Sequence, residues 1–282
     1  MVRWHLAKET DFPLIVNNLI SKEWAYVSLS SLLRIGLNQS SFTRNKWRML
    51  VNQNSMSEIS CILQTKSGLI LPALITKEIL TTRLRRLLTT NYSTNTIMGL
   101  REEVLHIQNL LNFKATNIVE YILMSINQQS FKPNLKEPPN LCIKSARAID
   151  TSKLFNLQKS YEIEEVILNP ERFNSQMCYE NLRSTLVKEI VLYGSINNIP
   201  IVKAGTNARG YNYDQIGGVF TDISQRHQGY ATAVMTKLLK KIFSQDKSAS
   251  LFVKSDNINA IKLYKTLGFV KKANFRIAYS YN

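Results

Sequence analysis

Two stretches of the chain decide its fold, and the first is Arg226-His227-Gln228-Gly229-Tyr230-Ala231. It stands at the start of a predicted helix whose apolar residues recur at helical spacing to about Phe243. The first N–H groups of a helix have no partner within it, and the helix dipole places partial positive charge there. A glycine lets an anion approach without a clashing side chain, so the stretch predicts a phosphate site. Taken alone, however, a glycine before a helix is more often only a cap.

The second stretch is Asn257-Ile258-Asn259-Ala260-Ile261-Lys262-Leu263-Tyr264-Lys265-Thr266-Leu267-Gly268-Phe269. Its Ala260, Leu263, Tyr264 and Leu267 fall on adjoining positions of one helical face, so Tyr264 should point toward a sheet. A single tyrosine on an apolar face is usually part of the core. What makes Tyr264 a candidate for chemistry is the phosphate-binding loop that precedes it.

Together, the two stretches resemble the GNAT acyltransferase superfamily. The Q/R-x-x-G-x-G/A signature is matched by Arg226, Gly229 and Ala231. The N-x-x-A-x-x-L-Y-x-x-x-G-F signature is matched by Asn257, Ala260, Leu263, Tyr264, Gly268 and Phe269. Both motifs stand in the family's order and at the family's separation, and the resemblance is carried by residues 141–282.

The resemblance implies that the co-substrate is an acyl-coenzyme A, with acetyl-CoA as the expected donor. The strand that ends in Val219-Phe220-Thr221 should then pair with the pantetheine arm as an added strand would. Asn257 should lie close to that arm, and Tyr264 should protonate the leaving thiolate as a general acid. The residues expected to hold the pyrophosphate are Arg226, His227, Gln228, Gly229, Tyr230, Ala231 and Thr232.

An amine acceptor, with a pKa near roughly 10.4, must lose a proton before it attacks, so a base is expected. Asp214, on the third predicted strand of the second half, is a weak candidate, and Glu189 and Asp222 are further carboxylates near the sheet. Asp222 is expected to shape the loop rather than to act as the base. Asp256 is expected to cap the helix that carries Tyr264.

Three glutamates, Glu162, Glu164 and Glu165, fall in an expected acceptor loop, residues 160–185. They could attract a cationic amine or form a solvated helix face, and the interpretation favoured here is the solvated face. A second irregular acceptor loop is expected at residues 204–213, beside predicted strands at 199–204 and 211–221. Gly217 and Gly218 lie inside the second of these strands and predict a bulge or a close approach.

The chain reads as one architecture used twice. Each half begins with a short strand, an Asp/Thr cap and a helix, and each ends with a helix that closes in Leu111-Asn112-Phe113 or Leu267-Gly268-Phe269, followed by a strand. The full chain also resembles bacterial two-part GNAT proteins, in which a degenerate copy precedes an intact one. This resemblance implies an α/β (α+β) protein of tandem GNAT-like folds, each a mixed, mostly antiparallel sheet flanked by helices. The expected division is a domain at 1–127, a proline-rich linker at 128–140 and a catalytic domain at 141–282.

The first half departs from the pattern at the positions that carry chemistry. Residues 73–78 hold no Q/R-x-x-G-x-G/A motif before a helix predicted at 77–88, and the last helix has no tyrosine where Tyr264 stands. This half is accordingly expected to be degenerate, not to bind coenzyme A, and to wall the acceptor cleft of the second half.

Composition bounds the remaining alternatives. The chain has 282 residues, 44% of them hydrophobic, and a formal charge of +16 that attracts anions such as a polyphosphate, a nucleic acid or an acidic protein. No apolar run or leader predicts a membrane helix or secretion, and three scattered cysteines without a CxxC pair fit a cytoplasmic protein with no metal. The expected function is an acetyl-CoA-dependent N-acetyltransferase that acts on an unidentified amine by direct attack. A non-catalytic module that senses acyl-CoA or binds a polyanion stays open as the alternative.

Overall fold

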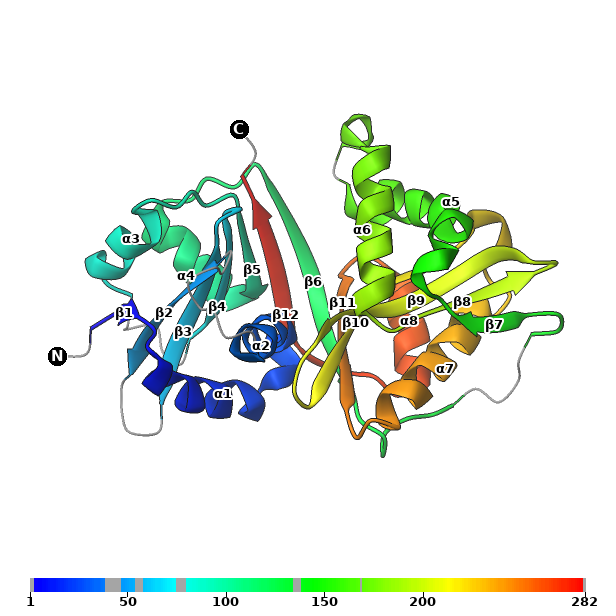
Figure 1. Ribbon diagram of the computed structural model, residues 1–282, viewed down its shortest axis with the longest axis horizontal. Coiled ribbons are helices and arrows are strands. Elements are labelled where there is room, and N and C mark those ends of the chain that lie inside the picture. The colour runs from blue at the N-terminus through cyan, green and yellow to red at the C-terminus, as the bar shows by residue number, and fades with distance from the viewer. Residues whose placement is uncertain are drawn as a thin grey trace.

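The computed structural model describes residues 3–38, 47–53, 58–74, 80–133, 138–167 and 169–280. These residues form a sheet of twelve strands that runs through the whole molecule, in the order β1-β2-β3-β4-β5-β12-β6-β11-β10-β9-β8-β7 (Figure 1). Only β4 with β5 and β10 with β11 pair in parallel, so the sheet is mixed and mostly antiparallel, as predicted.

The two halves of the chain contain the same series of elements. The first half comprises β1 (His5–Leu6), α1 (Phe12–Ser21), α2 (Glu23–Asn38), β2 (Trp47–Gln53), β3 (Ile59–Thr65), β4 (Leu69–Ala73), α3 (Thr82–Thr89), β5 (Thr96–Leu100), α4 (Arg101–Leu111) and β6 (Asn117–Ile126). The second comprises β7 (Cys142–Ser145), α5 (Thr151–Tyr161), α6 (Ser175–Lys188), β8 (Val191–Ile196), β9 (Ile199–Arg209), β10 (Tyr213–Thr221), α7 (Tyr230–Phe243), β11 (Ser248–Lys254), α8 (Ile258–Leu267) and β12 (Val270–Tyr279). The expected tandem fold is therefore confirmed.

The last strand of each copy pairs with the other copy. Strand β12 lies between β5 and β6, and β6 in turn pairs with β11, so the two copies exchange their final strands at the middle of the sheet (Figure 1). Across the central pair, Arg276 faces Glu120, and the Arg276 Nε donates to Glu120 Oε1 at 2.9 Å. The exchange makes one continuous sheet out of two folds.

Helices cover both faces of the sheet, because successive residues of a buried strand point to opposite sides. In the first copy, Met49 and Val51 pack with α1 and α2, while Leu50 packs with α3 and α4. In the second copy, Val191 and Tyr193 pack with α5 and α6, which lie above the strands in Figure 1, while Leu192 packs with α7 below them.

Some of the predicted helix and strand ends agree with the structure and others differ from it. Asn112 and Gly268 take left-handed conformations, with φ of 51° and 102°, and end α4 and α8 as predicted. Strand β9 continues to Arg209, so the loop expected at 204–213 is mostly strand. The helix predicted at 77–88 is described from Thr82 onward, and its residues 77–79, like linker residues 134–137, lie outside the described residues.

Glu23, the first residue of α2, is fully buried against the second copy. Its Oε1 accepts from the backbone N–H of Tyr211 (2.7 Å), and its Oε2 accepts from those of Asn212 (2.6 Å) and Tyr213 (3.1 Å). The Ser30 hydroxyl also donates to Oε1. A carboxylate of the first copy therefore closes the turn between β9 and β10 of the second.

Candidate functional site

The candidate site begins where β10 and β11 separate. The two strands pair in parallel only from Tyr213 to Ile216 of β10. Beyond Ile216, β10 stays on β9, while β11 stays on β6 as far as Lys254. The V between them opens toward the start of α7, so the main chain of β10 is exposed on the side where a ligand could add as a strand.

A bulge marks the start of the V. The register of β10 on β9 shifts between Gly217 and Phe220, and Gly218 has a φ of +61°. A Cβ on Gly217 would stand 2.5 Å from the Asn207 side chain. The bulge predicted from the two glycines is thus confirmed, and the group that comes close to Gly217 is the Asn207 side chain.

The loop before α7 has the geometry of an anion cradle. His227 has a φ of +64° and Gly229 a φ of +80°, and Gly229 is the N-cap of α7. Residues that alternate in this way direct consecutive N–H groups to one side, where they form a concave nest for anions. The Ala233 N–H reaches back to the Gly229 carbonyl (3.1 Å), so the amides before it belong to the unpaired first turn of the helix.

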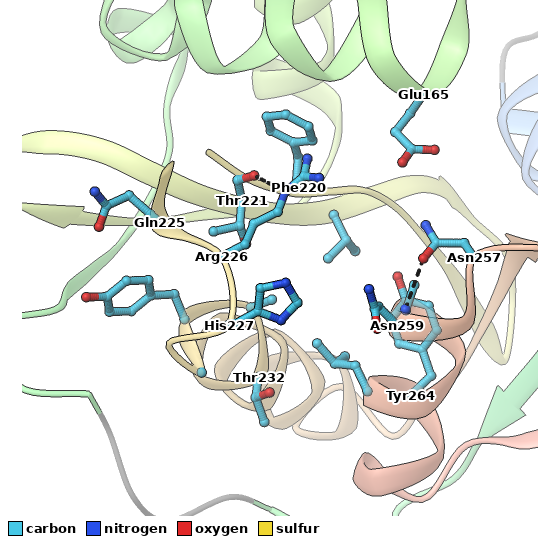
Figure 2. A pocket seen from close by; sticks show the side chains of 16 residues that line it. Glu165, Phe220, Thr221, Gln225, Arg226, His227, Thr232, Asn257, Asn259 and Tyr264 are labelled. Carbon is cyan, nitrogen blue, oxygen red and sulfur yellow. Dashed lines mark hydrogen bonds between the residues drawn. The ribbon is translucent and has the colours of Figure 1, made fainter. Parts of the chain in front are cut away.

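A cavity of about 350 Å³ lies between this loop, the end of β10 and α8 (Figure 2). Gln228 is the predicted cofactor-binding residue that does not line it, because its carboxamide oxygen instead accepts from the Tyr230 hydroxyl at 3.0 Å. The predicted residues that line the cavity are Val219, Phe220, Thr221, Arg226, His227, Gly229, Tyr230, Ala231, Thr232, Asn257 and Tyr264.

Helix α8 contributes Asn257 and Tyr264 to the cavity. Asn257 is the N-cap, since its Oδ1 accepts from the Ala260 N–H at 3.1 Å, and the expectation that Asp256 would cap this helix was wrong. The Asn257 carboxamide nitrogen points away from that bond (Figure 2). Tyr264 is 8% exposed, and burial, with smaller effects of Tyr161 and Glu165, raises the pKa of its phenol, which is therefore protonated at neutral pH.

Arg226 links the loop before α7 to the helical segment Glu162–Val166, which follows α5. Its Nη2 donates to both carboxylate oxygens of Glu164, at 2.7 and 2.9 Å, and its Nε donates to the Thr221 carbonyl at 3.2 Å. The guanidinium also lies over the Phe220 ring. Arg226 thus lines the cavity while it holds the end of β10, the loop and the Glu164 segment in one arrangement.

A second cavity, of about 230 Å³, adjoins the first. Glu165, Val219, Asn257, Ala260 and Tyr264 line both. The farther walls of the second cavity are formed by β6 of the first copy and by the exchanged strand β12. Tyr121 is the first-copy residue in this lining, and the expectation that the first copy walls an acceptor cleft stays a prediction.

Glu165 reaches this junction from a π-helical turn, Glu162–Val166, that continues α5. Such turns insert one residue into a helix and are frequent at functional sites. The solvated helix face favoured from the sequence does not describe Glu165, because its side chain is 27% exposed and pairs with Lys254 at 3.1 Å. Sequence spacing gave no signal of this, since the three glutamates alone do not reveal where the helix widens.

The structure places the carboxylates considered as bases away from the cavity. Asp214 is fully buried in ion pairs with Arg209 (3.3 Å) and Lys247 (2.9 Å), at the closed end of the V. Glu189 accepts from the Thr206 hydroxyl at 2.6 Å. Asp222 accepts from the Ser224 N–H at 3.0 Å, which confirms that it shapes the loop.

Lys203 is a buried residue near the site that sequence reasoning missed. It faces Phe220 across the β9–β10 ladder, its Nζ donates to the Gly218 carbonyl at 2.9 Å, and it lies over the Tyr161 ring. Burial lowers its pKa to about 7, against the opposing effects of Glu162 and Cys178. Its position in the apolar run Ile199-Pro200-Ile201-Val202-Lys203-Ala204 was the available signal.

Lys203→Met should change how stability depends on pH. Because the folded pKa of about 7 lies below the ordinary 10.5, the unfolded chain binds the extra proton between these values, and the stability of the natural protein rises with pH there. The variant should lack this part of the rise. Urea unfolding of both proteins at pH 7 and pH 9 measures it, and parallel pH dependences would contradict the burial of a titrating Lys203.

In the first copy the corresponding gap, between β4 and β5, is filled by a side chain of that copy, Glu103. Strands β4 and β5 pair at Leu69 and Ile70 and then part. Glu103, 7% exposed, accepts there from the Leu74 N–H (2.7 Å) and the Tyr26 hydroxyl (2.8 Å). The main-chain position where a ligand strand would pair is thus occupied by a carboxylate.

Two features are absent from the residues that the structure describes. None of their helices is long and apolar enough to cross a membrane. They also contain no group of three His, Cys, Asp or Glu side chains that could hold a metal ion.

Residues 159–269 match a family model described as "Acetyltransferase (GNAT) family". This span contains the π-helical turn, β10, the loop, α7 and α8 up to Phe269. No curated protein matches the chain at a significant level.

Three solved structures show the same fold over the whole length. A Drosophila protein has 10% identity and a TM-score of 0.70, with 99% of both chains covered. A tandem GNAT protein from the clavulanic acid biosynthesis pathway has 10% identity and a TM-score of 0.59, with 100% of this chain and 99% of that one covered. An acetyltransferase of the GNAT family from Colwellia psychrerythraea has 14% identity and a TM-score of 0.53, with 99% and 100% covered.

Proposed function

The chain belongs to the GNAT superfamily, with the family's fold present in tandem, and from this premise we propose that it is an acetyl-CoA-dependent N-acetyltransferase. The acyl donor is held in the second copy, at residues of the domain we place at 141–282, and the first copy does not bind one. The observation that carries the proposal is that the β10 strand end, the loop before α7 and the Tyr264 helix line a common cavity.

The residues of this cavity fit the parts of coenzyme A. The amides from His227 to Thr232 and the α7 dipole suit a pyrophosphate, and Gly229 leaves room there, since a Cβ at this position would have Pro138 as its nearest neighbour, at 3.8 Å. The bulged end of β10 at Val219 suits the two amides of a pantetheine arm. The Asn257 carboxamide nitrogen supplies a further donor beside the arm.

The catalytic step that we assign to this chain is proton transfer at Tyr264. When bound, acetyl-CoA supplies an activated acyl group, and an uncharged amine attacks it directly. The Tyr264 hydroxyl then protonates the departing thiolate. We assign Asp214 a structural role, because its two ion pairs hold it away from the cavity.

Acetyl-CoA should raise the melting temperature of the protein. At a hundred times its dissociation constant, a ligand stabilises the folded state by about 2.7 kcal/mol, which corresponds to a rise of roughly 5–10 °C for a chain of this size. Gly229→Glu should abolish the rise by placing bulk and negative charge in the cradle. The measurement is a thermal melt of each protein with and without millimolar acetyl-CoA.

Gly229→Ala is the matched control, because it shares the backbone strain of a side chain at φ +80° and lacks the charge. It should keep part of the rise. If the natural protein shows no rise, the proposed function is wrong. A rise without transfer to any amine would instead support the module that only senses acyl-CoA. We also retain the cytoplasm as the proposed location, since Cys61, Cys142 and Cys178 are all free thiols.

A further inference from the structure

The two adjoining cavities meet at a pair of ionisable groups on opposite sides. Glu165 points toward the cavity from the helical segment above, while Tyr264 and Asn257 come from α8 (Figure 2). Among the described residues that line both cavities, Glu165 is the carboxylate and Tyr264 the phenol. If the first cavity holds the acyl donor, the second is where an acceptor can reach the thioester.

The charge of Glu165 is held in place rather than free in solvent. Lys254, on β11, pairs with it at 3.1 Å, and both side chains are only about a third exposed or less. Three phenols, those of Tyr121, Tyr161 and Tyr264, line the second cavity together with Glu165. Burial raises the pKa of each, and Glu165 adds to the rise. These three come from β6, α5 and α8, so the cavity that Glu165 lines is built from elements of both copies.

The second cavity has aromatic walls. Tyr121 and Phe252 meet edge to face with ring centroids 5.1 Å apart, and Tyr161 and Tyr279 also line the space. Its volume of about 230 Å³ is below the range of roughly 300–1,000 Å³ usual for ligand pockets, so it suits a small molecule. Aromatic faces beside a fixed carboxylate favour a cation carried on an apolar body.

On the basis of the proposed function, we propose that the acceptor is a small primary amine on an aromatic or similarly flat apolar body, which binds as an ammonium at Glu165. Glu165 accepts one proton from the ammonium, and the neutral nitrogen forms its bond to the acyl carbon while the carbon–sulfur bond breaks. Tyr264 protonates the thiolate, and the second proton lost by the nitrogen restores the Tyr264 phenol. The proton on Glu165 passes to solvent, so the reaction releases one proton in all.

Glu165→Gln tests the proton transfer because it keeps the size of the side chain and removes the base. With 2-phenylethylamine as the acceptor, kcat/KM should fall about a hundredfold at pH 7.5. The ratio of kcat/KM of the natural protein to that of the variant should shrink about tenfold for each pH unit up to pH 9.5. As the pH rises, more of the amine is already deprotonated in solution and needs no base. Glu171→Gln, an exposed carboxylate in the adjoining turn, should match the natural protein.

Two further variants separate chemistry from structure. The double variant Glu165→Gln with Lys254→Gln should lose as much kcat/KM as Glu165→Gln alone. It removes the lysine that the single variant leaves without its carboxylate partner. Tyr121→Ala should raise KM for 2-phenylethylamine at least tenfold while the melting shift with acetyl-CoA persists. An undiminished rate in Glu165→Gln at pH 7.5 would overturn the assignment of the base.

An amine panel tests the acceptor class independently of these variants. We expect kcat/KM for 2-phenylethylamine to exceed those for 1,4-diaminobutane, glycine and a lysine-containing peptide by at least tenfold, read by mass spectrometry. Preferred acetylation of glycine or of the peptide would overturn the aromatic acceptor and leave the acetyltransferase standing. Absence of any melting shift with acetyl-CoA would instead remove the proposed function itself.

Discussion

Glu23→Ala is expected to lower the free energy of unfolding by about 3–5 kcal/mol, a loss measurable by urea denaturation. Three backbone N–H groups, those of Tyr211, Asn212 and Tyr213, would lose their acceptor in a buried position. Each buried donor left unsatisfied costs roughly 1–3 kcal/mol, and water that enters the space offsets part of this. The result is large because one side chain serves three donors.

The position of Glu23 explains why the loss should affect the site as well. The turn that it holds joins β9 to β10, and β10 carries the bulge and the end that line the cavity. Two neighbouring hydrogen bonds also join α2 to the second copy. The Ser28 hydroxyl donates to Gln215 Oε1 (3.0 Å), and the Arg209 N–H donates to the Ser31 hydroxyl (3.2 Å). We therefore expect Glu23→Ala also to weaken binding of acetyl-CoA.

Glu23→Gln and Glu9→Ala are the control variants for this prediction. The glutamine keeps one acceptor oxygen but turns an N–H₂ group toward a donor, so its loss should fall between zero and that of alanine. Glu9 is exposed and should change stability by less than about 0.5 kcal/mol. Equal stabilities of Glu23→Ala and the natural protein would show that the hairpin turn does not depend on this carboxylate.

The parts of the structure that the sequence predicted are those set by neighbours in the chain. The glycine cap before α7, the left-handed ends at Asn112 and Gly268, and the bulge at Gly217 each follow from the conformational needs of one or two residues. The two motifs around Gly229 and Tyr264 located the cavity for the same reason, since each lies on a single loop or helix.

What the sequence did not predict depends on partners far along the chain. The pattern marked β6 and β12 as strands, yet the same pattern fits any neighbour, so the exchange between the copies was not visible. Asp214 was a candidate base and is instead neutralised by Arg209 and Lys247, whose approach only the folded sheet brings about. Glu165 needed the extra residue of a π-helical turn to face the cavity.

Tyr264→Phe is expected to lower kcat about a hundredfold or more while the affinity for acetyl-CoA stays nearly the same. The phenol lines both cavities, and a general acid contributes typically 10²–10⁴-fold. Its raised pKa does not disqualify it, because the same burial also makes a departing thiolate more basic than it is in water. Loss of the hydroxyl removes the proton donor and leaves the ring that packs against Phe269 in place.

The pH profile gives the prediction a second, independent readout. Since burial raises the pKa of Tyr264 above its ordinary value of 10, the phenol stays protonated and kcat of the natural protein should not decline below that pH through loss of the acid. In the Phe variant, kcat should instead follow the supply of protons from water and fall as the pH rises. Tyr179→Phe, at a half-buried tyrosine of α6 whose hydroxyl is hydrogen-bonded to that of Ser152, is the matched control and should leave both kcat and its profile unchanged. If Tyr264→Phe retains the natural rate and profile, the thiolate is protonated by solvent and Tyr264 serves only to pack α8 against the sheet.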